Sequence, residues 1–359
     1  MPVSLIPVEN VYFLLSYAWD ALPEAAIIDV ARVPSNNLVD LYAFVQCGGV
    51  EHLARRGLER GYVSLDDELT AVRGRIKLLE SQSRMLPKHG RLICEADELT
   101  PNTLPNQIIK ATLASLARVS SIDSNLKRRM QGIRRGLSDI NDIRLRASDF
   151  SRVQLHANHR YYRFLISVCK LVYEATLVDE KTGSYRFRDF LRDHKQMSSL
   201  FQRFICNFYR IERKDRGIRG EQIGWRVATR QKSALDYLPR MTTDVSLGVG
   251  EVKLIIDTKY YHETLSSYHE AQSVHSEHLY QLLAYLSNAE QGWYKRVEGM
   301  LLYPVVSTRL RLLYDELQGY RVRICTVDLA KNWQAVRGEL LEILDWVAVG
   351  EEVGGVTYA

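Results

Sequence analysis

The sequence predicts an α/β protein, with a mixed sheet flanked by helices in its C-terminal part and a mixed α+β domain before it. Two observations support this fold class. After residue 190 the hydrophobic periods follow the order helix, three strands, helix, strand. Before it, helical periods surround one strand-like region. The 359 residues are enough for two domains, each with its own core.

The N-terminal part consists mainly of predicted helices. Their apolar residues recur at helical spacing, as Val11, Leu14, Leu15 and Ala18 do in the first. The segment 61–80 instead shows partial alternation, which predicts two strands joined by a charged turn. The predicted helices cover 8–22, 36–57 with a break or bend at Gly48 and Gly49, 103–119 and 159–177.

A boundary is expected between residues 150 and 190, where the chain is polar and rich in turn residues. We place the domains at 1–160 and 161–359. The second domain begins with an amphipathic helix over 197–212. Its other predicted elements are strands at 224–230, 240–247 and 252–261, a helix at 277–290, and strands at 297–306 and 321–329.

Composition and cysteine usage narrow the class of protein. Charged residues make up 25% of the chain and no run of 18 apolar residues occurs, so no membrane span is expected. An acidic residue and no basic one precede the first apolar stretch, which argues against a signal peptide. The five cysteines are scattered and never spaced C-x-x-C, which predicts reduced thiols in a cytoplasmic protein.

The apolar run Leu254–Ile256 leads directly into Asp257, Thr258 and Lys259. Burying such charges costs several kcal/mol unless each has a partner. A hairpin turn before this strand would place Asp244 beside Asp257, and Asp257 and Lys259 share a face. Two adjacent carboxylates repel each other, and Mg²⁺ relieves the repulsion.

This arrangement predicts a magnesium site held by Asp244, Asp257 and the backbone carbonyl of Thr258. Lys259 would then orient or deprotonate the attacking water near a scissile phosphate. A salt-bridged aspartate and lysine at a strand end is the alternative explanation, and it stays open at this point.

Positive charge is concentrated between residues 201 and 240, which hold ten Lys or Arg and four Asp or Glu. This cluster predicts a surface that follows a phosphate backbone, or else a solvated basic loop. Its expected DNA-binding residues are Arg213, Lys214, Arg216 and Arg219.

Two motifs of the second domain resemble those of known nucleases. The pattern T-D, followed by an apolar strand that ends in D-T-K, resembles the active site of the PD-(D/E)xK superfamily. Gln281 and Tyr285, four residues apart on one helix face, resemble the Q-x-x-x-Y motif of its RecB-type branch.

A longer series of segments resembles the McrC family, the nuclease subunits of McrBC restriction systems, which cut DNA carrying modified cytosine. The resemblance runs from residue 6 to 340 and is most specific over 239–261. The segments include, in order, "IPVENVYFLLSYAW", "NNLVDL", "RRGLERGY", "RGRI", "TLPNQIIKATL", "RYYRFLISVCKLV", "LPRMTTDV", "IIDTKYY" and "LYQLLAYL".

The resemblance implies a restriction-endonuclease-like fold for the second domain and an Mg²⁺-dependent endodeoxyribonuclease. It also implies double-stranded DNA with modified cytosine as substrate. Many members of the superfamily carry a metal-binding glutamate where this chain has Gln202, whose neutral amide adds no charge. The implied catalytic residues are Asp244, Asp257, Lys259, Gln281 and Tyr285.

The same resemblance implies that residues 1–160 engage a McrB-type hexameric AAA+ GTPase and stimulate its GTP hydrolysis. No G-x-x-x-x-G-K-[ST] segment occurs, so GTP is expected on the partner and not on this chain. Arg73 and Arg75 suit insertion into an acidic channel, although solvated strand charges explain them equally well.

Other functions stay open at this stage. A stand-alone RecB-type repair nuclease and a non-catalytic adaptor that only activates a GTPase are the two rivals. His275 and His278 offer a further pair of metal ligands, for which a polar loop is the simpler explanation.

Overall fold

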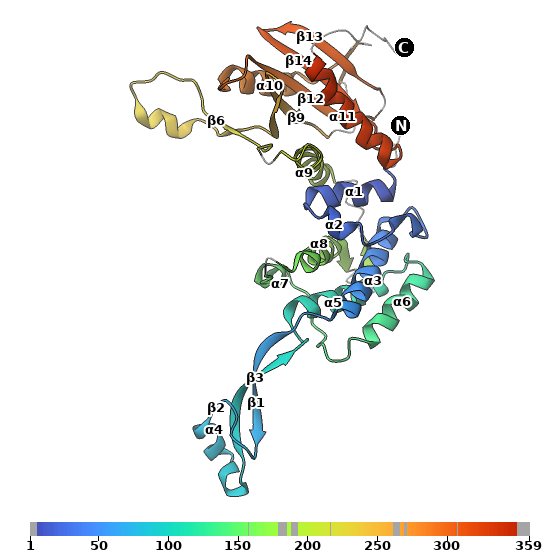
Figure 1. Cartoon of the computed structure of the whole chain (residues 1–359), viewed down its shortest axis with the longest axis vertical. Helices are drawn as coiled ribbons and strands as arrows, with labels where there is room; N and C mark the ends of the chain where they lie inside the picture. Colours follow the sequence, from blue (N-terminus) through green and yellow to red (C-terminus); the bar gives the residue numbers. More distant parts are fainter. Residues whose placement is uncertain are drawn as a thin grey trace. The chain divides into compact units, whose positions relative to one another are not determined.

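The computed structural model divides the chain into two compact units (Figure 1). Unit 1 comprises Met1–Ala25 and Asp189–Ala359, and unit 2 comprises Ala26–Arg188. The described residues are 6–156, 158–178, 185–187, 193–215, 217–260, 266–268, 271–306 and 308–349.

These units divide the chain differently from the domains expected at 1–160 and 161–359. Helix α1 (Val8–Ala18) packs against α9 (His194–Glu212) in unit 1, where their aromatic side chains meet. Helix α8 (Arg160–Ala175) packs on α3 and α5 in unit 2. Long-range packing of aromatic and aliphatic side chains therefore sets the division, and local periodicity does not report such packing.

Unit 2 is built around α3 (Leu38–Arg56), which contacts α5, α6 and α8. The predicted break or bend at Gly48 and Gly49 is wrong, because α3 continues through both residues. A Cβ atom at Gly49 would lie 2.3 Å from a methyl carbon of Leu165, so this glycine allows α8 to approach α3 closely. The other elements are η1 (Val30–Arg32), α5 (Leu104–Ala117), α6 (Ser124–Arg135), α7 (Ala147–Arg152), β4 (Thr176–Val178) and β5 (Tyr185–Phe187).

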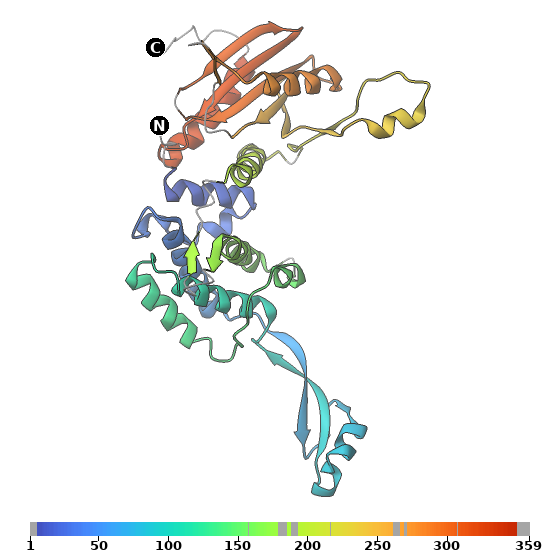
Figure 2. The ribbon, with the colours of Figure 1, turned by 180° about the vertical axis from the view of Figure 1, so that it is seen from behind.

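A long hairpin, residues 61–100, extends from the helices of unit 2 (Figures 1 and 2); we call it the finger. Its strand order is β1-β3-β2, with β1 paired to β3 along its whole length. The two strands predicted within 61–80 are present, but both pair with β3, and Leu78 begins a helix instead of continuing a strand. The finger consists of β1 (Gly61–Leu69), β2 (Arg75–Ile76), α4 (Leu78–Ser83), η2 (Leu86–His89) and β3 (Leu92–Thr100).

Unit 1 contains a five-stranded mixed sheet in the order β13-β14-β12-β9-β8, which confirms the predicted fold class. The three inner strands run parallel, and each edge strand is antiparallel to its neighbour. Every residue of β9 is buried, as expected for an inner strand covered on both faces. The strands are β8 (Val245–Val249), β9 (Val252–Thr258), β12 (Arg296–Pro304), β13 (Arg311–Leu317) and β14 (Tyr320–Val327).

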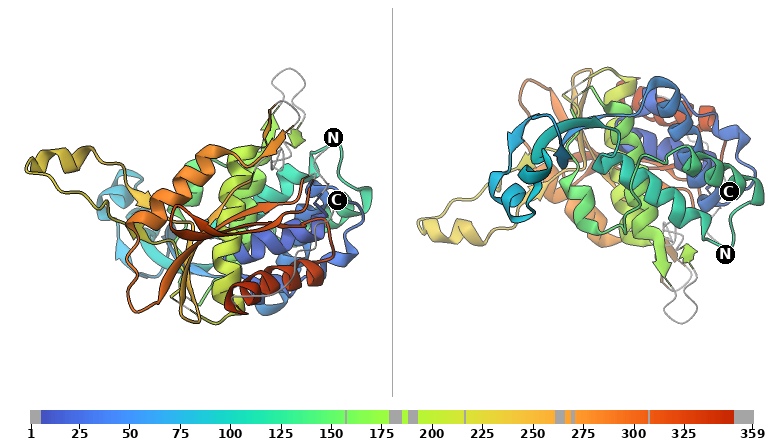
Figure 3. Two further views of the ribbon diagram at one scale, coloured as in Figure 1. Left: turned by 90° about the horizontal axis from the view of Figure 1, so that it is seen from above. Right: turned by 90° about the horizontal axis from the view of Figure 1, so that it is seen from below.

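Helices cover both faces of this sheet (Figure 3). On one face, α10 (Ser276–Asn288) packs so closely that a Cβ at Gly299 would meet Leu282 and Leu286. The opposite face carries α11 (Trp333–Val349), which contacts β14 and β8. Among the described residues, unit 1 also contains the short helix α2 (Leu22–Ala25).

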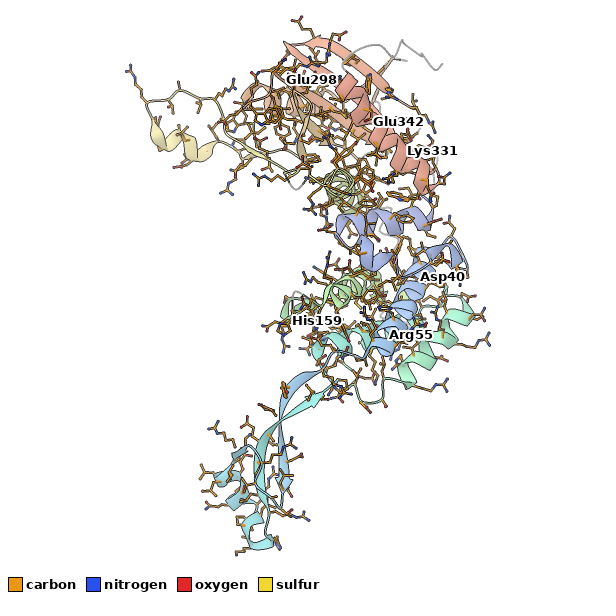
Figure 4. The ribbon with its side chains drawn as sticks, in the orientation of Figure 1. Asp40, Arg55, His159, Glu298, Lys331 and Glu342 are labelled. Carbon is orange, nitrogen blue, oxygen red and sulfur yellow. The ribbon has the colours of Figure 1, made fainter. Side chains whose placement is uncertain are left out.

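A buried ion pair lies inside the face covered by α11. Glu298 of β12 and Arg323 of β14 form a salt bridge, and both side chains are buried (Glu298 is labelled in Figure 4). Arg296 contacts the other carboxylate oxygen of Glu298 at 2.5 Å. The Arg323 guanidinium also lies over the ring of Trp346, 5.1 Å from its centroid. Each charge therefore has a partner despite its burial.

Between α9 and β8 the chain forms an arm, residues 224–240, flanked by the paired strands β6 (Gln222–Ile223) and β7 (Met241–Thr242). The strand predicted at 224–230 is wrong, because this segment lies in the arm and has no strand partner. The remaining described elements are η4 (Lys232–Tyr237) in the arm, β10 (Ser266–Tyr268) and β11 (Ala271–Ser273).

Two sequence-based expectations concern the whole chain. All five cysteines are free thiols, four of them buried. Among the described helices, none combines the length and the apolarity that crossing a bilayer requires.

Candidate active site

The hairpin of β8 and β9 brings the two aspartates together. Val245 pairs with Ile256, so Asp244 and Asp257 lie opposite each other one position further along. Gly250, at φ +57°, adopts the left-handed conformation that the tight turn requires. Asp244 itself precedes β8 by one residue and does not lie within the strand, which corrects the predicted strand 240–247.

Asp244 is fixed by the end of β9. Its Oδ2 accepts two hydrogen bonds from Thr258, at 2.7 Å from the backbone N–H and 2.6 Å from the side-chain hydroxyl. Burial raises the pKa of the Asp244 carboxyl, and these hydrogen bonds oppose the rise. Neither hydrogen bond uses Oδ1, which leaves this oxygen for another ligand.

Asp257 is the most deeply buried acid of the site, with 0% of its surface exposed. The Lys259 ammonium lies 3.0 Å from Oδ2 and forms an ion pair with it, whereas no partner is described for Oδ1. The pKa of Asp257 is raised to about 7, mainly by burial; the Lys259 ammonium opposes the rise, and the Asp244 charge adds to it.

Lys259 is held by the neighbouring helix. Its ammonium donates a hydrogen bond of 2.6 Å to Oε1 of Gln281, and the amide nitrogen of Gln281 donates one of 2.7 Å to the Tyr285 hydroxyl. Gln281 and Tyr285 share a face of α10, as predicted from their spacing. The structure thus brings all five predicted catalytic residues into one connected group.

One residue near this group was not expected as part of it. His278 lies one turn before Gln281, is buried, and has its Nδ1 2.9 Å from the hydroxyl of Tyr303. The pKa of His278 is lowered to about 4, mainly by burial and in addition by the nearby charges of Lys259 and His275. The spacing of three residues from Gln281 is the signal that could have placed His278 on this face.

Gln202 lies on α9 and is partly exposed. Cys206, one turn later on the same helix, is close enough to Asp244 for that charge to raise the pKa of its thiol, after burial as the main cause. This face of α9 therefore lies toward Asp244.

Among the predicted DNA-binding residues that the structure describes, Arg219 is the one that contacts β8. Arg213, Lys214 and Arg219 are exposed, and no described carboxylate forms an ion pair with them. Arg219 forms an isolated β-bridge with Ser246 of β8. The Ser246 N–H donates a hydrogen bond of 2.9 Å to the backbone carbonyl of Arg219. Arg216 lies outside the described residues.

The predicted partner-binding arginines lie in unit 2. Arg73 and Arg75 are exposed on the finger, on either side of Gly74. A Cβ at Gly74 would lie 2.2 Å from the carbonyl oxygen of Glu95, so only glycine lets this loop lie so close to β3.

The residues present fit a magnesium ion. Mg²⁺ binds through one or two carboxylates, with waters and phosphate oxygens completing its octahedron. Asp257 offers the buried Oδ1, for which no partner is described, and Asp244 offers its own Oδ1. Among the described residues, no group of three or more His, Cys, Asp or Glu is arranged to hold a metal, so the fit depends on this pair.

A mixed sheet flanked by helices, with two carboxylates and a lysine gathered at one hairpin, defines an α/β protein with a candidate metal-binding site. The chain belongs to the McrBC family: residues 8–304 match the family model described as "McrBC 5-methylcytosine restriction system component".

Two known proteins resemble the chain over most of its length. It is 34% identical over 345 residues to an Escherichia coli (strain K12) protein described as "Type IV methyl-directed restriction enzyme EcoKMcrBC", covering 96% of this chain and 99% of the relative. A solved half-complex of Thermococcus gammatolerans McrB AAA+ hexamers with bound McrC matches with a TM-score of 0.57. That match covers 94% of this chain and 76% of the solved chain at 16% identity, so it shows the fold alone.

Proposed function

We propose that this chain is the Mg²⁺-dependent DNA endonuclease subunit of a restriction complex that acts on modified cytosine and is driven by an AAA+ GTPase. The observation that carries the proposal is the buried Asp257 carboxylate opposite Asp244, with Lys259 as its described charge partner. Two neighbouring carboxylates beside one lysine leave an excess of negative charge, which a bound cation compensates.

Each residue of the group has a distinct task in this proposal. Asp244, Asp257 and the Thr258 carbonyl would hold the metal. When bound, Mg²⁺ supplies charge stabilisation for the scissile phosphate and a more acidic water. Lys259 donates hydrogen bonds to the attacking water or to a phosphate oxygen. Gln281 keeps its ammonium beside Asp257 instead of in solvent.

The salt-bridge alternative explains less of this geometry. A purely structural pair would satisfy both carboxylate oxygens, whereas Oδ1 of Asp257 is buried without a described partner. It also gives no reason for a second buried carboxylate opposite the first, since the two repel. A metal site accounts for both observations.

The finger supports the second half of the proposal, engagement of a GTPase partner. Its exposed apolar side chains include Leu79 at 83% and Tyr62 at 75% exposure. Exposed apolar groups beside Arg73 and Arg75 are typical of a surface that binds another protein. The similar Thermococcus gammatolerans complex holds McrC on McrB AAA+ hexamers, and we infer the same kind of partner for this chain.

The test is the Lys259→Ala variant, assayed with the partner GTPase, GTP and methylated DNA. We expect strand cleavage to be lost and stimulation of GTP hydrolysis to be retained, because the site lies in unit 1 and the finger in unit 2. Lys295→Ala is the matched control, since Lys295 belongs to the same unit but forms an exposed ion pair with Glu251.

Three outcomes would contradict the proposal. Full restriction by the Lys259→Ala protein would indicate an adaptor that only activates the GTPase. Cleavage of unmodified DNA by the purified chain without GTP would indicate a stand-alone repair nuclease. Loss of both activities in a folded protein would show that the two units do not divide the work.

A further inference from the structure

The arm, residues 224–240, is a solvent-exposed segment of unit 1. Every one of its side chains with a described exposure is exposed. Five of them are large and apolar, with Tyr237 at 88% exposure. They are Trp225, Val227, Leu235, Tyr237 and Leu238. Such a concentration of exposed apolar surface marks an interaction site.

The base of the arm is nevertheless anchored firmly. The indole N–H of Trp225 donates a hydrogen bond of 2.7 Å to the carbonyl of Pro239, which ties the two sides together. The Arg226 N–H bonds to Asn288 at 2.7 Å, and its guanidinium bonds to the carbonyl of Ala289 at 2.8 Å. The arm is therefore fixed to the C-terminal end of α10 and presents its far end to solvent.

Charge favours a nucleic-acid partner over a protein. The arm carries four cations and one anion, and no described ion pair neutralises Arg230 or Arg240. A basic segment with interspersed aromatic groups suits the phosphate backbone and grooves of DNA. The charged residues are Arg226, Arg230, Lys232, Arg240 and the single acid Asp236.

The arm is linked to the elements that carry the candidate active site. Its last residue, Arg240, precedes Asp244 by four positions, and its anchor on α10 follows Gln281 on the same helix. With roughly 8 residues on each side it can reach at most about 25 Å. This length is enough to span one groove of a duplex, about 12 Å wide for the major groove.

We propose that the arm 224–240 grips double-stranded DNA next to the bond that is cut, with Arg230 and Arg240 on phosphates and Tyr237 inside a groove. This inference rests on the proposed nuclease function but concerns a surface distinct from the Asp244 and Asp257 pair. It assigns the duplex a second contact besides the loop that carries Arg213 and Arg219.

The experiment measures binding of the full chain to a short fluorescein-labelled duplex by anisotropy, in EDTA and over a range of salt concentrations. Arg230→Ala with Arg240→Ala should reduce the slope of log K against log salt by about 1.8, at about 0.9 per phosphate contact. Tyr237→Ala should weaken binding about 5- to 100-fold and leave the slope unchanged, because an aromatic contact releases no counterions.

Trp293→Ala is the matched control, since Trp293 is an aromatic residue of the same unit that is 76% exposed and lies outside the arm. Its affinity for the duplex should equal that of the unaltered chain. Sedimentation of the same proteins without DNA tests the rival occupant, a second copy of the chain.

Unchanged affinity and slope in both arm variants would overturn the inference. A change in self-association without a change in DNA binding would overturn it too, because the arm would then contact another copy. Because these measurements contain no metal and no cleavage step, they are independent of the Lys259→Ala test. If the arm contributes to binding and Lys259→Ala still cuts, the nuclease assignment fails while the arm stands.

Discussion

The buried Asp257 carboxyl should make the metal-free protein less stable as the pH rises. Its pKa is about 7 in the folded protein, against an ordinary value of 3.8. A carboxyl with a raised pKa binds more protons in the folded state than in the unfolded state between these two values. Its contribution to stability is therefore complete below about pH 4 and is lost as the pH rises through about 7.

The magnitude follows from the shift of about three pKa units. At 1.36 kcal/mol per unit, ionising Asp257 in the folded protein costs on the order of 4 kcal/mol at about pH 8. Asp257→Asn replaces the carboxyl by a neutral group of the same size. The variant should therefore match the unaltered protein near pH 4 and be more stable by up to about 4 kcal/mol near pH 8.

The assay is urea unfolding in EDTA, followed by tryptophan fluorescence. All five tryptophans (Trp19, Trp225, Trp293, Trp333 and Trp346) belong to unit 1, so the signal reports on the unit that contains Asp257. Added Mg²⁺ should stabilise the unaltered protein, by about 2.7 kcal/mol at a hundred times its dissociation constant, and should have no such effect on Asp257→Asn.

Asp236→Asn is the control, because Asp236 is exposed in the arm and its replacement should change stability by less than about 0.5 kcal/mol. The reasoning is refuted if the metal-free protein is equally stable at both ends of this pH range. It is also refuted if Mg²⁺ stabilises the Asp257→Asn variant as much as the unaltered chain.

Three other substitutions test the packing and positioning described above. Glu298→Gln leaves the buried Arg323 without its anion and should lower the free energy of unfolding, followed by tryptophan fluorescence, by about 3–5 kcal/mol. A loss below about 1 kcal/mol would contradict the ion pair. Gln281→Ala removes the hydrogen bond that holds the Lys259 ammonium, so the cleavage rate of the complex should fall about 100-fold while its affinity for the duplex stays unchanged. Equal losses of cleavage rate and affinity would indicate a binding role for Gln281. Gly49→Ala forces a methyl group into α8 and should cost about 1–3 kcal/mol, measured by hydrogen exchange in α3; unchanged protection would show that α8 moves freely.

The hairpin with its two aspartates and the paired positions on α10 could be predicted because they are local in character. The apolar run of β9 is continuous since the strand is covered on both faces, and the turn at Gly250 fixes the hairpin that aligns Asp244 with Asp257. The spacing of Gln281 and Tyr285 follows from helix geometry alone. These features depend on neighbours within about one hairpin or one helical turn.

The features that escaped prediction depend on distant partners. The sequence predicts a break in the helix at Gly48 and Gly49, because Leu165, which requires a glycine at 49, is far away along the chain. It predicts a strand over 224–230 from alternating apolar residues, but no described strand pairs with this segment. The buried position of His278 depends in part on Tyr303 of β12. Periodicity records which face is apolar but not what covers it.

The packing of α1 on α9 has a consequence for biosynthesis. The ribosome completes α1 at Ala18 and α9 only at Glu212, so at about 5–20 residues per second some 10–40 s separate the two. Unit 2 is synthesised entirely within this interval and contains all the residues of its own core. During this interval the apolar face of α1 lacks the aromatic side chains of α9. This exposed face is the kind of surface that chaperones bind on nascent chains. The order of synthesis thus requires unit 1 to begin first and to fold last.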